Sequence, residues 1–216
     1  MADVLARVAA PRCTIAWDVD DVLNDLTREW LEHGWRPEHP EASVRYEQLT
    51  ANPPHERLGA TREEYLRSLD AFRLARFDRL EPSRAVLAWL ARHGADCRHV
   101  ALTATPRRVA PLSAAWVLRH FGDWIRVFAF VPSPREDDRF PAAGTKGEAL
   151  EWLTGVDVLV DDSPANVAAA RALGRSAVLV PRPWNDAPGT IEDALSALLD
   201  VVRRRGAPRA RVGASA

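Results

Sequence analysis

Apolar residues along this chain gather in five short runs rich in β-branched residues, a pattern that predicts buried strands. The runs are Cys13–Asp18, Arg98–Thr103, Ile125–Val131, Val156–Asp161 and Ala177–Pro181. Helical periodicity follows in Ser83–His93, Val109–Phe121, Lys146–Leu153, Ala165–Leu173 and Ile191–Arg204. This alternation predicts an α/β fold, a three-layer Rossmann-like parallel sheet with helices on both faces.

One interval, between the first and second strands, holds roughly eighty residues, far more than a single crossover needs. Helical patterns in Asp25–His33 and Thr61–Arg76 flank an irregular stretch, Gly34–Gly59, that is rich in Pro, His and Glu. We interpret this interval as a helical cap, which can close over a site at the strand ends and exclude water. The plainer alternative is an insertion that only extends the core. The expected division is a helical cap at 24–79, an α/β core at 1–23 and 80–205, and a disordered tail at 206–216.

The composition favours a soluble enzyme or binding protein of ordinary globular type. The chain has 216 residues, 47% of them apolar and 27% charged, with a formal net charge of -1. That charge argues against nucleic acid as a partner. We see no apolar run of membrane-spanning length and no signal-peptide core in Met1–Pro11, so we expect a cytoplasmic protein without a membrane partner. Cys13 and Cys97 are expected to be reduced core thiols. The oligomeric state stays open.

The first strand runs directly into acidic residues. Asp18, Asp20 and Asp21 follow the apolar run within four positions, where their charges repel and their burial is unfavourable. Residues two apart in a strand point to the same side, so Asp18 and Asp20 can face one site. A bound cation would remove the repulsion. The pattern therefore suggests a metal site at this strand end.

Other strand ends add complementary groups. Thr103 closes the second strand, Asp161 and Asp162 follow the fourth, and Lys146, the only lysine among 29 basic residues, begins a helix. Parallel strands bring these ends to one edge of the sheet, where ligands bind in such folds. A cation at a helix N-terminus opposes the helix dipole, whereas an anion bound there is favoured by both. We therefore expect a phosphate pocket.

Together these groups resemble the motifs of the haloacid dehalogenase-like superfamily of aspartate-nucleophile phosphatases. In chain order the motifs are Asp18-Val19-Asp20, Thr103, Lys146 and Asp161-Asp162, and the likeness extends from about Thr14 to Trp184. Further details look like the 5'(3')-deoxyribonucleotidase group: the acidic run through Asp25, Leu80-Glu81-Pro82, Ala115-Trp116-Val117, Phe121-Gly122 and Pro183-Trp184-Asn185. That group usually has Gly where this chain has Asp21, and Asp adopts unusual backbone angles less readily than Gly.

The resemblance implies roles for the first strand end. Asp18 would be the nucleophile that forms an aspartyl-phosphate. Asp20 would protonate the leaving oxygen and then activate water. Mg²⁺ would be the cofactor, held by the Asp18 carboxylate, the Asp20 backbone carbonyl and Asp162.

It also implies how the phosphoryl group is held. Thr103, Lys146 and backbone amides near Ala104 would bind its oxygens. Asp161 would orient Lys146 or a metal-bound water. For the remainder of the substrate we name Trp35, Tyr46 and Asp25 as candidate contacts, the two aromatic side chains for stacking on a base or sugar.

These roles describe a Mg²⁺-dependent phosphomonoesterase that acts on a small phosphorylated substrate, a nucleotide or a similarly small ester. Asp20 separates such an enzyme from dehalogenases, which lack the second acid, but not from phosphomutases. Two alternatives stay open. One is a phosphatase for a sugar phosphate or a phosphoprotein. The other is a catalytically silent protein that has kept the fold and binds a phosphate or a partner.

Overall fold

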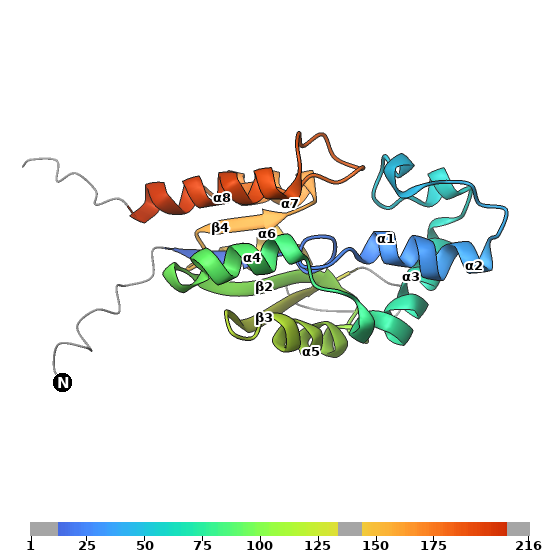
Figure 1. Ribbon diagram of the computed structural model, residues 1–216, viewed down its shortest axis with the longest axis horizontal. Helices are drawn as coiled ribbons and strands as arrows, with labels where there is room; N and C mark the ends of the chain where they lie inside the picture. The colour runs from blue at the N-terminus through green and yellow to red at the C-terminus, as the bar shows by residue number, and fades with distance from the viewer. Residues whose placement is uncertain (1–12, 134–143, 207–216) are drawn as a thin grey trace, which may run out of the picture.

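The strands form one parallel sheet in the computed structural model, which describes residues 13–133 and 144–206. The strands are β1 (Thr14–Trp17), β2 (Arg98–Thr105), β3 (Ile125–Pro132), β4 (Val158–Asp161) and β5 (Ser176–Leu179). Within the described residues their order is β3-β2-β1-β4-β5, so β1 lies at the centre of the sheet (Figure 1). The predicted α/β fold is confirmed. The segment expected to be a disordered tail lies outside the described residues, apart from Gly206 at the end of the last helix.

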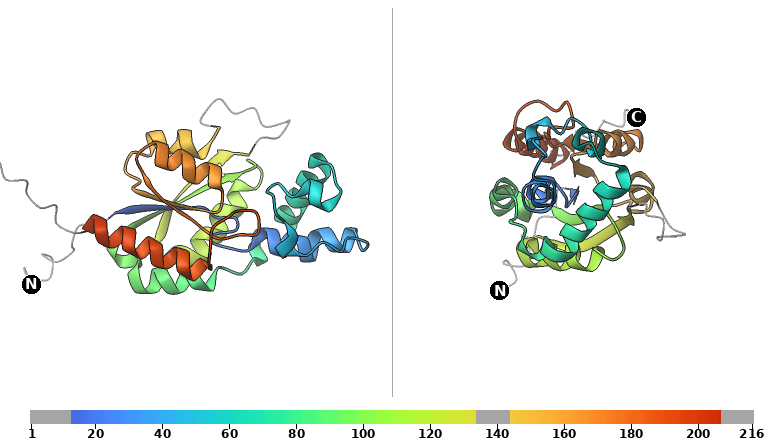
Figure 2. Two further views of the ribbon diagram at one scale, coloured as in Figure 1. Left: turned by 90° about the horizontal axis from the view of Figure 1, so that it is seen from above. Right: turned by 90° about the vertical axis from the view of Figure 1, so that its right-hand side faces the viewer.

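Helices cover both faces of this sheet (Figure 2). They are α4 (Arg84–His93), α5 (Ala110–Phe121), α6 (Lys146–Trp152), α7 (Pro164–Ala172) and α8 (Ile191–Gly206), with a 3₁₀ turn at Gly94–Asp96. Ile15 and Trp17 point into a core shared with α4, α5 and α8. Ala16, between them, points to the opposite face, into a second core shared with α6 and α7. Successive side chains of β1 thus enter one core or the other, which explains why its sequence is continuously apolar.

The long insertion lies beyond the carboxyl ends of the strands, at the right of Figure 1. We call residues 24–79 the cap segment. Its elements are α1 (Leu26–Trp30), a π-helical turn (Leu31–Trp35), α2 (Arg36–Glu38), 3₁₀ turns at Tyr46–Gln48, His55–Leu58 and Phe77–Arg79, and the long helix α3 (Arg62–Arg76). Thr61 and Glu64 cap α3 reciprocally, as the Thr-x-x-Glu spacing predicts: Thr61 Oγ1 accepts from Glu64 N at 3.2 Å, and Glu64 Oε2 accepts from Thr61 N at 2.8 Å.

Buried aromatic contacts anchor β1 just before it reaches the acidic residues. Trp17 Nε1 donates to His99 Nδ1 at 3.0 Å, and His99 Nε2 donates in turn to Gly94 O at 2.9 Å. Trp89 packs edge-on against Trp17 with ring centroids 5.6 Å apart. Burial lowers the pKa of His99, which keeps the imidazole neutral and suited to this relay.

The two cysteines and the length of the helices bear on two further expectations from the sequence. Cys13 and Cys97 are both buried thiols, with their Sγ atoms 3.5 Å apart. No helix in the described part of the chain is long and apolar enough to cross a membrane.

We predict that Leu90→Ala, in the core beneath β1, lowers the free energy of unfolding by about 2–5 kcal/mol, because it removes a fully buried side chain and leaves a cavity. Leu118→Ala on α5, where the side chain is 51% exposed, should change it by no more than about 0.5 kcal/mol. Urea unfolding of both variants measures the difference. Equal losses would contradict this assignment of the core.

Candidate functional site

A buried lysine bridges carboxylates from two strands. Asp18, directly after β1, is 6% exposed, and its Oδ1 accepts from Lys146 Nζ at 2.7 Å. The same ammonium, 2% exposed, donates to Asp161 Oδ2 at 2.8 Å. Lys146 is the first residue of α6, whose N-cap is Thr145. The structure thus brings Lys146 together with carboxylates at the ends of two strands.

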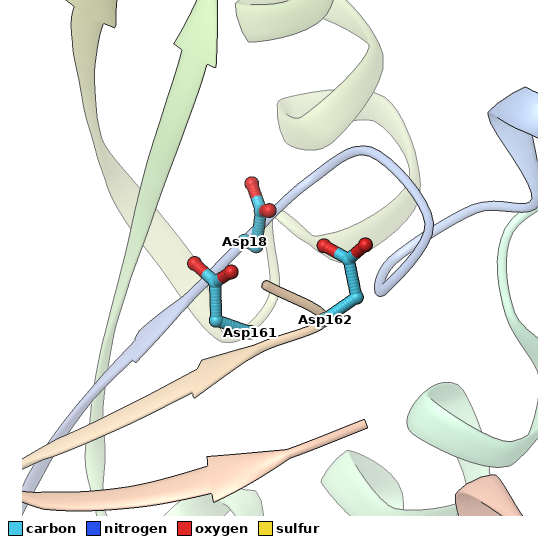
Figure 3. A group of neighbouring side chains, drawn as sticks. All are labelled: Asp18, Asp161 and Asp162. Atoms are coloured by element: carbon cyan, nitrogen blue, oxygen red, sulfur yellow. The ribbon is translucent and has the colours of Figure 1, made fainter. Parts of the chain in front are cut away.

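The second acidic pair is held by its own loop and by the segment after β5. Asp161 Oδ1 accepts from Ser163 N at 2.9 Å and from Asn166 Nδ2 at 3.0 Å. Asp162 Oδ2 accepts from Trp184 Nε1 at 2.6 Å. Asp18, Asp161 and Asp162 each offer a carboxylate oxygen within 4.8 Å of the others, at the ends of β1 and β4 (Figure 3). This geometry suits a bound cation.

Burial makes this cluster electrostatically strained. It raises the pKa of Asp18 to about 7, even though Lys146 acts in the opposite direction. It likewise raises the pKa of Asp162, with Asp161 and Asp18 adding repulsion. Burial acts to lower the pKa of Lys146, but Asp161 and Asp18 outweigh it and hold that pKa above its usual value. One ammonium thus faces three buried carboxyl groups, and further positive charge would stabilise their ionised forms.

A buried hydroxyl lies near the end of the neighbouring strand, which continues two residues past the Thr103 end expected from the sequence. Thr103, on β2, is 1% exposed, and its Oγ1 has no hydrogen-bond partner among the described residues. Leaving such a group unpaired costs about 1–3 kcal/mol. The next residue, Ala104, lines the cavity above the carboxylates. Thr103 itself is not among the residues that line this cavity.

Asp20 contacts a cap residue that the sequence did not single out. Arg73 Nη2, from α3, donates to Asp20 Oδ2 at 2.5 Å. The Arg73 side chain is 8% exposed and also lies 3.4 Å from Asp70 Oδ1. Nothing in the sequence distinguishes Arg73 from the many other arginines, because its role depends on how α3 packs over the core.

Asp21 occupies a strained backbone position. Its φ is 61°, and no other non-glycine residue in the described chain has a positive φ. The side chain offsets this strain, since its two carboxylate oxygens accept from Thr27 N at 2.9 Å and Thr27 Oγ1 at 2.5 Å. Arg182 Nε donates to the Asp21 carbonyl at 2.6 Å. Burial raises the pKa of Asp21 to about 6, against the opposing effects of Arg182 and Thr27. At the position where the deoxyribonucleotidase group usually has Gly, this chain thus has an Asp whose unusual backbone conformation is stabilised by hydrogen bonds from Thr27 and Arg182.

A cavity of about 230 Å³ lies between these strand ends and the cap segment. Its floor is polar and its cap wall is largely apolar, with two arginines. Core residues that line it are Asp18, Asp20, Asp21, Ala104, Ser133, Lys146, Asp162, Ser163 and Asn166; cap residues are Leu26, Thr27, Asn52, Pro53, Arg62, Tyr65, Leu66, Leu69 and Arg73.

The three expected substrate contacts do not line this cavity. Trp35 is buried and stacks on His39 with ring centroids 3.9 Å apart. Tyr46 is buried between Arg28 and the edge of Trp184. Asp25 makes no side-chain cap and instead pairs with Arg182 Nη1 at 2.9 Å. Trp35 thus packs within the cap segment, and Tyr46 packs between the cap segment and Trp184 of the core, which the local sequence does not reveal.

Trp184 is a second residue whose role was missed. The sequence alone gives Pro183-Trp184-Asn185 no function beyond its place after the last strand. In the fold, Asn185 Nδ2 donates to Asp162 O at 2.7 Å and to Val180 O at 2.9 Å, which brings the Trp184 indole to the Asp162 carboxylate. The sequence signal for this role is a Trp, whose indole N–H can donate a hydrogen bond, followed by Asn just after a strand end.

Solved structures of other proteins share the fold of this chain. No family model matches the chain, and no curated protein matches it. Among solved structures, it is similar to a haloacid dehalogenase-like family hydrolase from Streptococcus pneumoniae (12% identity, TM-score 0.56, covering 89% of this chain and 97% of that one). It is also similar to a predicted phosphoglycolate phosphatase from Haemophilus somnus 129PT (12%, 0.56, 89% and 99%).

A third likeness is to protein tyrosine kinase A from Mycobacterium tuberculosis (23% identity, TM-score 0.61, covering 88% of this chain and 98% of that one). Proteins described by different activities thus share this architecture, so the likeness speaks for the fold and not for a particular reaction. The chain has the α/β fold of the haloacid dehalogenase-like hydrolases.

Proposed function

We propose that this protein is a Mg²⁺-dependent phosphomonoesterase for a small phosphate ester. The observation that carries the proposal is the Lys146 bridge between Asp18 and Asp161, with Asp162 beside it at the base of a cavity. This bridge places the buried Asp18 carboxylate, the proposed nucleophile, next to the Lys146 ammonium, which is suited to bind a phosphoryl oxygen. The unpartnered Thr103 hydroxyl supplies a further donor.

The reaction takes two steps. In the first, a carboxylate oxygen of Asp18 bonds to phosphorus as the bond between phosphorus and the ester oxygen breaks, and Asp20 gives its proton to that leaving oxygen. In the second, water loses a proton to Asp20 and bonds to phosphorus, which releases inorganic phosphate and restores Asp18. Lys146 and Thr103 hold the equatorial oxygens.

The residues present fit Mg²⁺. The ion prefers hard oxygen ligands, and the Asp18, Asp161 and Asp162 carboxylates lie within 4.8 Å of one another. Both carboxylate oxygens of Asp161 already accept hydrogen bonds, one from Lys146 and the other from its own loop, whereas Lys146 bonds only Oδ1 of Asp18. Asp18, Asp162 and the Asp20 backbone carbonyl are therefore the groups that would hold the ion. A divalent cation there would neutralise the charges that raise the pKa of Asp162 and would polarise the phosphoryl group.

The nucleotide substrate suggested by the sequence is one candidate among small esters. Trp35 and Tyr46 lie outside the cavity. Among the described residues that line it, Tyr65 is the only aromatic one. The cavity, about 230 Å³, is below the roughly 300–1,000 Å³ of ordinary ligand sites. This size favours a sugar phosphate or a smaller ester over a phosphoprotein segment. Retention of every reacting group disfavours a silent protein.

We predict that purified protein releases phosphate from members of a panel of nucleotides, sugar phosphates and short phosphorylated acids, and that EDTA abolishes the release. Asp18→Asn should lower kcat by about 10³-fold or more, since it removes the nucleophile. Asp123→Asn, an exposed carboxylate after α5, serves as control and should keep full activity. Full activity of Asp18→Asn would refute the nucleophile, and inactivity towards every ester would refute the function.

A second prediction concerns the indole that bonds Asp162. Trp184→Phe keeps an aromatic ring against Tyr46 but removes the N–H donor, so Asp162 is no longer oriented. We expect Mg²⁺ affinity to fall about 10- to 100-fold by isothermal titration calorimetry. Trp152→Phe, on an exposed indole, is the matched control and should bind Mg²⁺ normally. Unchanged affinity in Trp184→Phe would show that the bond is not needed.

A third prediction concerns pH. The folded, metal-free protein holds protons on Asp18 and Asp21 more tightly than the unfolded chain, since burial raises their pKa to about 7 and about 6. These groups therefore remove stability as pH rises from about 4 to about 7. Mg²⁺ competes with the proton on Asp18, so its stabilising effect should grow from about pH 5 to about pH 8, towards about 2.7 kcal/mol at a hundredfold excess over Kd.

Thermal unfolding with Mg²⁺ or EDTA across this range measures the effect. Asp162→Asn should lose most of the Mg²⁺ shift, and Asp123→Asn should keep it. A shift that is independent of pH would mean that the ion does not bind at these carboxylates.

A further inference from the structure

Two buried thiols meet at the amino ends of β1 and β2, the opposite end of these strands from Asp18 and Thr103. Cys13 stands directly before β1 and Cys97 directly before β2, and they are the two cysteines of the chain. Cys13 is 4% exposed and Cys97 is 9% exposed, and their Sγ atoms lie 3.5 Å apart. Heavy atoms at this distance are in contact, so no other side chain separates the two sulfur atoms.

The strand register places the two residues side by side. Thr14 pairs with Arg98 in the parallel ladder, so Cys13 and Cys97, one position earlier in each strand, lie opposite each other. Arg98 N donates to the Cys13 carbonyl at 2.9 Å, and Cys97 N donates to the Gly94 carbonyl at 3.1 Å. Neighbouring strands lie about 4.7–4.9 Å apart, within the Cα–Cα range of about 4.4–6.8 Å that a disulfide spans. The backbone thus already has the spacing that a covalent bond between the sulfurs requires.

One of the two sulfur atoms can be reached through an open cavity. Cys97 lines this cavity, which has a volume of about 400 Å³, whereas Cys13 is not among its described lining residues. Arg98 and Arg126 also line it, and Asp123 is the acidic residue among the described ones that do. The excess of positive charge favours the approach of an anionic thiol reagent such as glutathione disulfide, which carries carboxylates. Cys97 is therefore the thiol that such a reagent meets first, with Cys13 behind it.

We propose that Cys13 and Cys97 form a reversible disulfide when the folded protein meets a small disulfide oxidant. In the first step the Cys97 thiolate bonds to one sulfur of glutathione disulfide, whose sulfur–sulfur bond breaks and releases one glutathione thiolate. In the second step the Cys13 thiol loses its proton to water and its sulfur bonds to Cys97 Sγ, which releases the second glutathione. The protein gives up two electrons and two protons, and the oxidant takes them up as two molecules of reduced glutathione.

The new bond closes a loop of chain that contains the cap segment. Cys13 and Cys97 are 84 positions apart, and residues 24–79 lie between them. A cross-link of this length restricts the unfolded chain far more than the folded one, in which the two sulfur atoms are already in contact. Oxidation therefore stabilises the fold. The inference does not depend on the phosphomonoesterase function, because the proposed reaction uses neither thiol.

The test treats the reduced full-length protein with glutathione disulfide and follows its intact mass. We expect the loss of two thiol hydrogens, about 2 Da, and reversal by dithiothreitol. The Tm of the oxidised protein should exceed that of the reduced protein by about 5–15 °C. Cys13→Ala should stop at the mixed disulfide, with one glutathione on Cys97, whereas Cys97→Ala should keep its single thiol unmodified.

The two variants are matched controls for each other, because each lacks one thiol and they differ in which sulfur remains. Neither should show the rise in Tm. Two glutathione molecules on each wild-type chain, a disulfide-linked dimer or an unchanged mass would overturn the inference. A disulfide that forms but lowers the Tm would overturn it as well, since the folded structure would then not accommodate the bond. Glutathione bound to Cys97→Ala would contradict the assignment of Cys97 as the thiol that reacts first.

Discussion

The site depends on the burial of several carboxylates around a single ammonium group. Asp18, Asp161 and Asp162 meet because the central strand and its neighbour end side by side, and Lys146 offsets only part of their repulsion. Such an arrangement is unfavourable in the absence of a ligand. The rest of the structure compensates with rigid support: a hydrogen-bonded relay at Trp17 behind β1 and hydrogen bonds from nearby loops to the acidic residues.

The segment after β5 unites the two acidic loops. Arg182 bonds the carbonyl of Asp21 in the loop after β1, while Trp184 and Asn185 bond Asp162 after β4. The Trp184 ring also packs against Tyr46 of the cap segment. The cap therefore meets the core through the same side chains that orient the acidic residues. The position of the cap and the orientation of the Asp162 carboxylate are therefore physically linked through Trp184.

Fold and reaction are separable in this molecule. Similar architectures belong to proteins described as a hydrolase, a phosphatase and a tyrosine kinase, so the parallel sheet by itself does not select a reaction. The side chains at the strand ends define which chemistry is possible. Arg62 and Arg73 of the cap segment face those side chains across the cavity.

The sequence by itself determined the strands, the sheet type and the expectation that Asp18, Asp161 and Lys146 gather at one edge of the sheet, because parallel strands must present their carboxyl ends along one edge. The tertiary structure alone decided the cap contacts. Trp35 and Tyr46, expected in the cavity, are used to pack the cap, and Arg73 reaches Asp20 from 53 positions away. The physical reason is that local periodicity reveals which face of a helix is apolar, whereas the contacts across a long insertion depend on how that insertion packs as a whole.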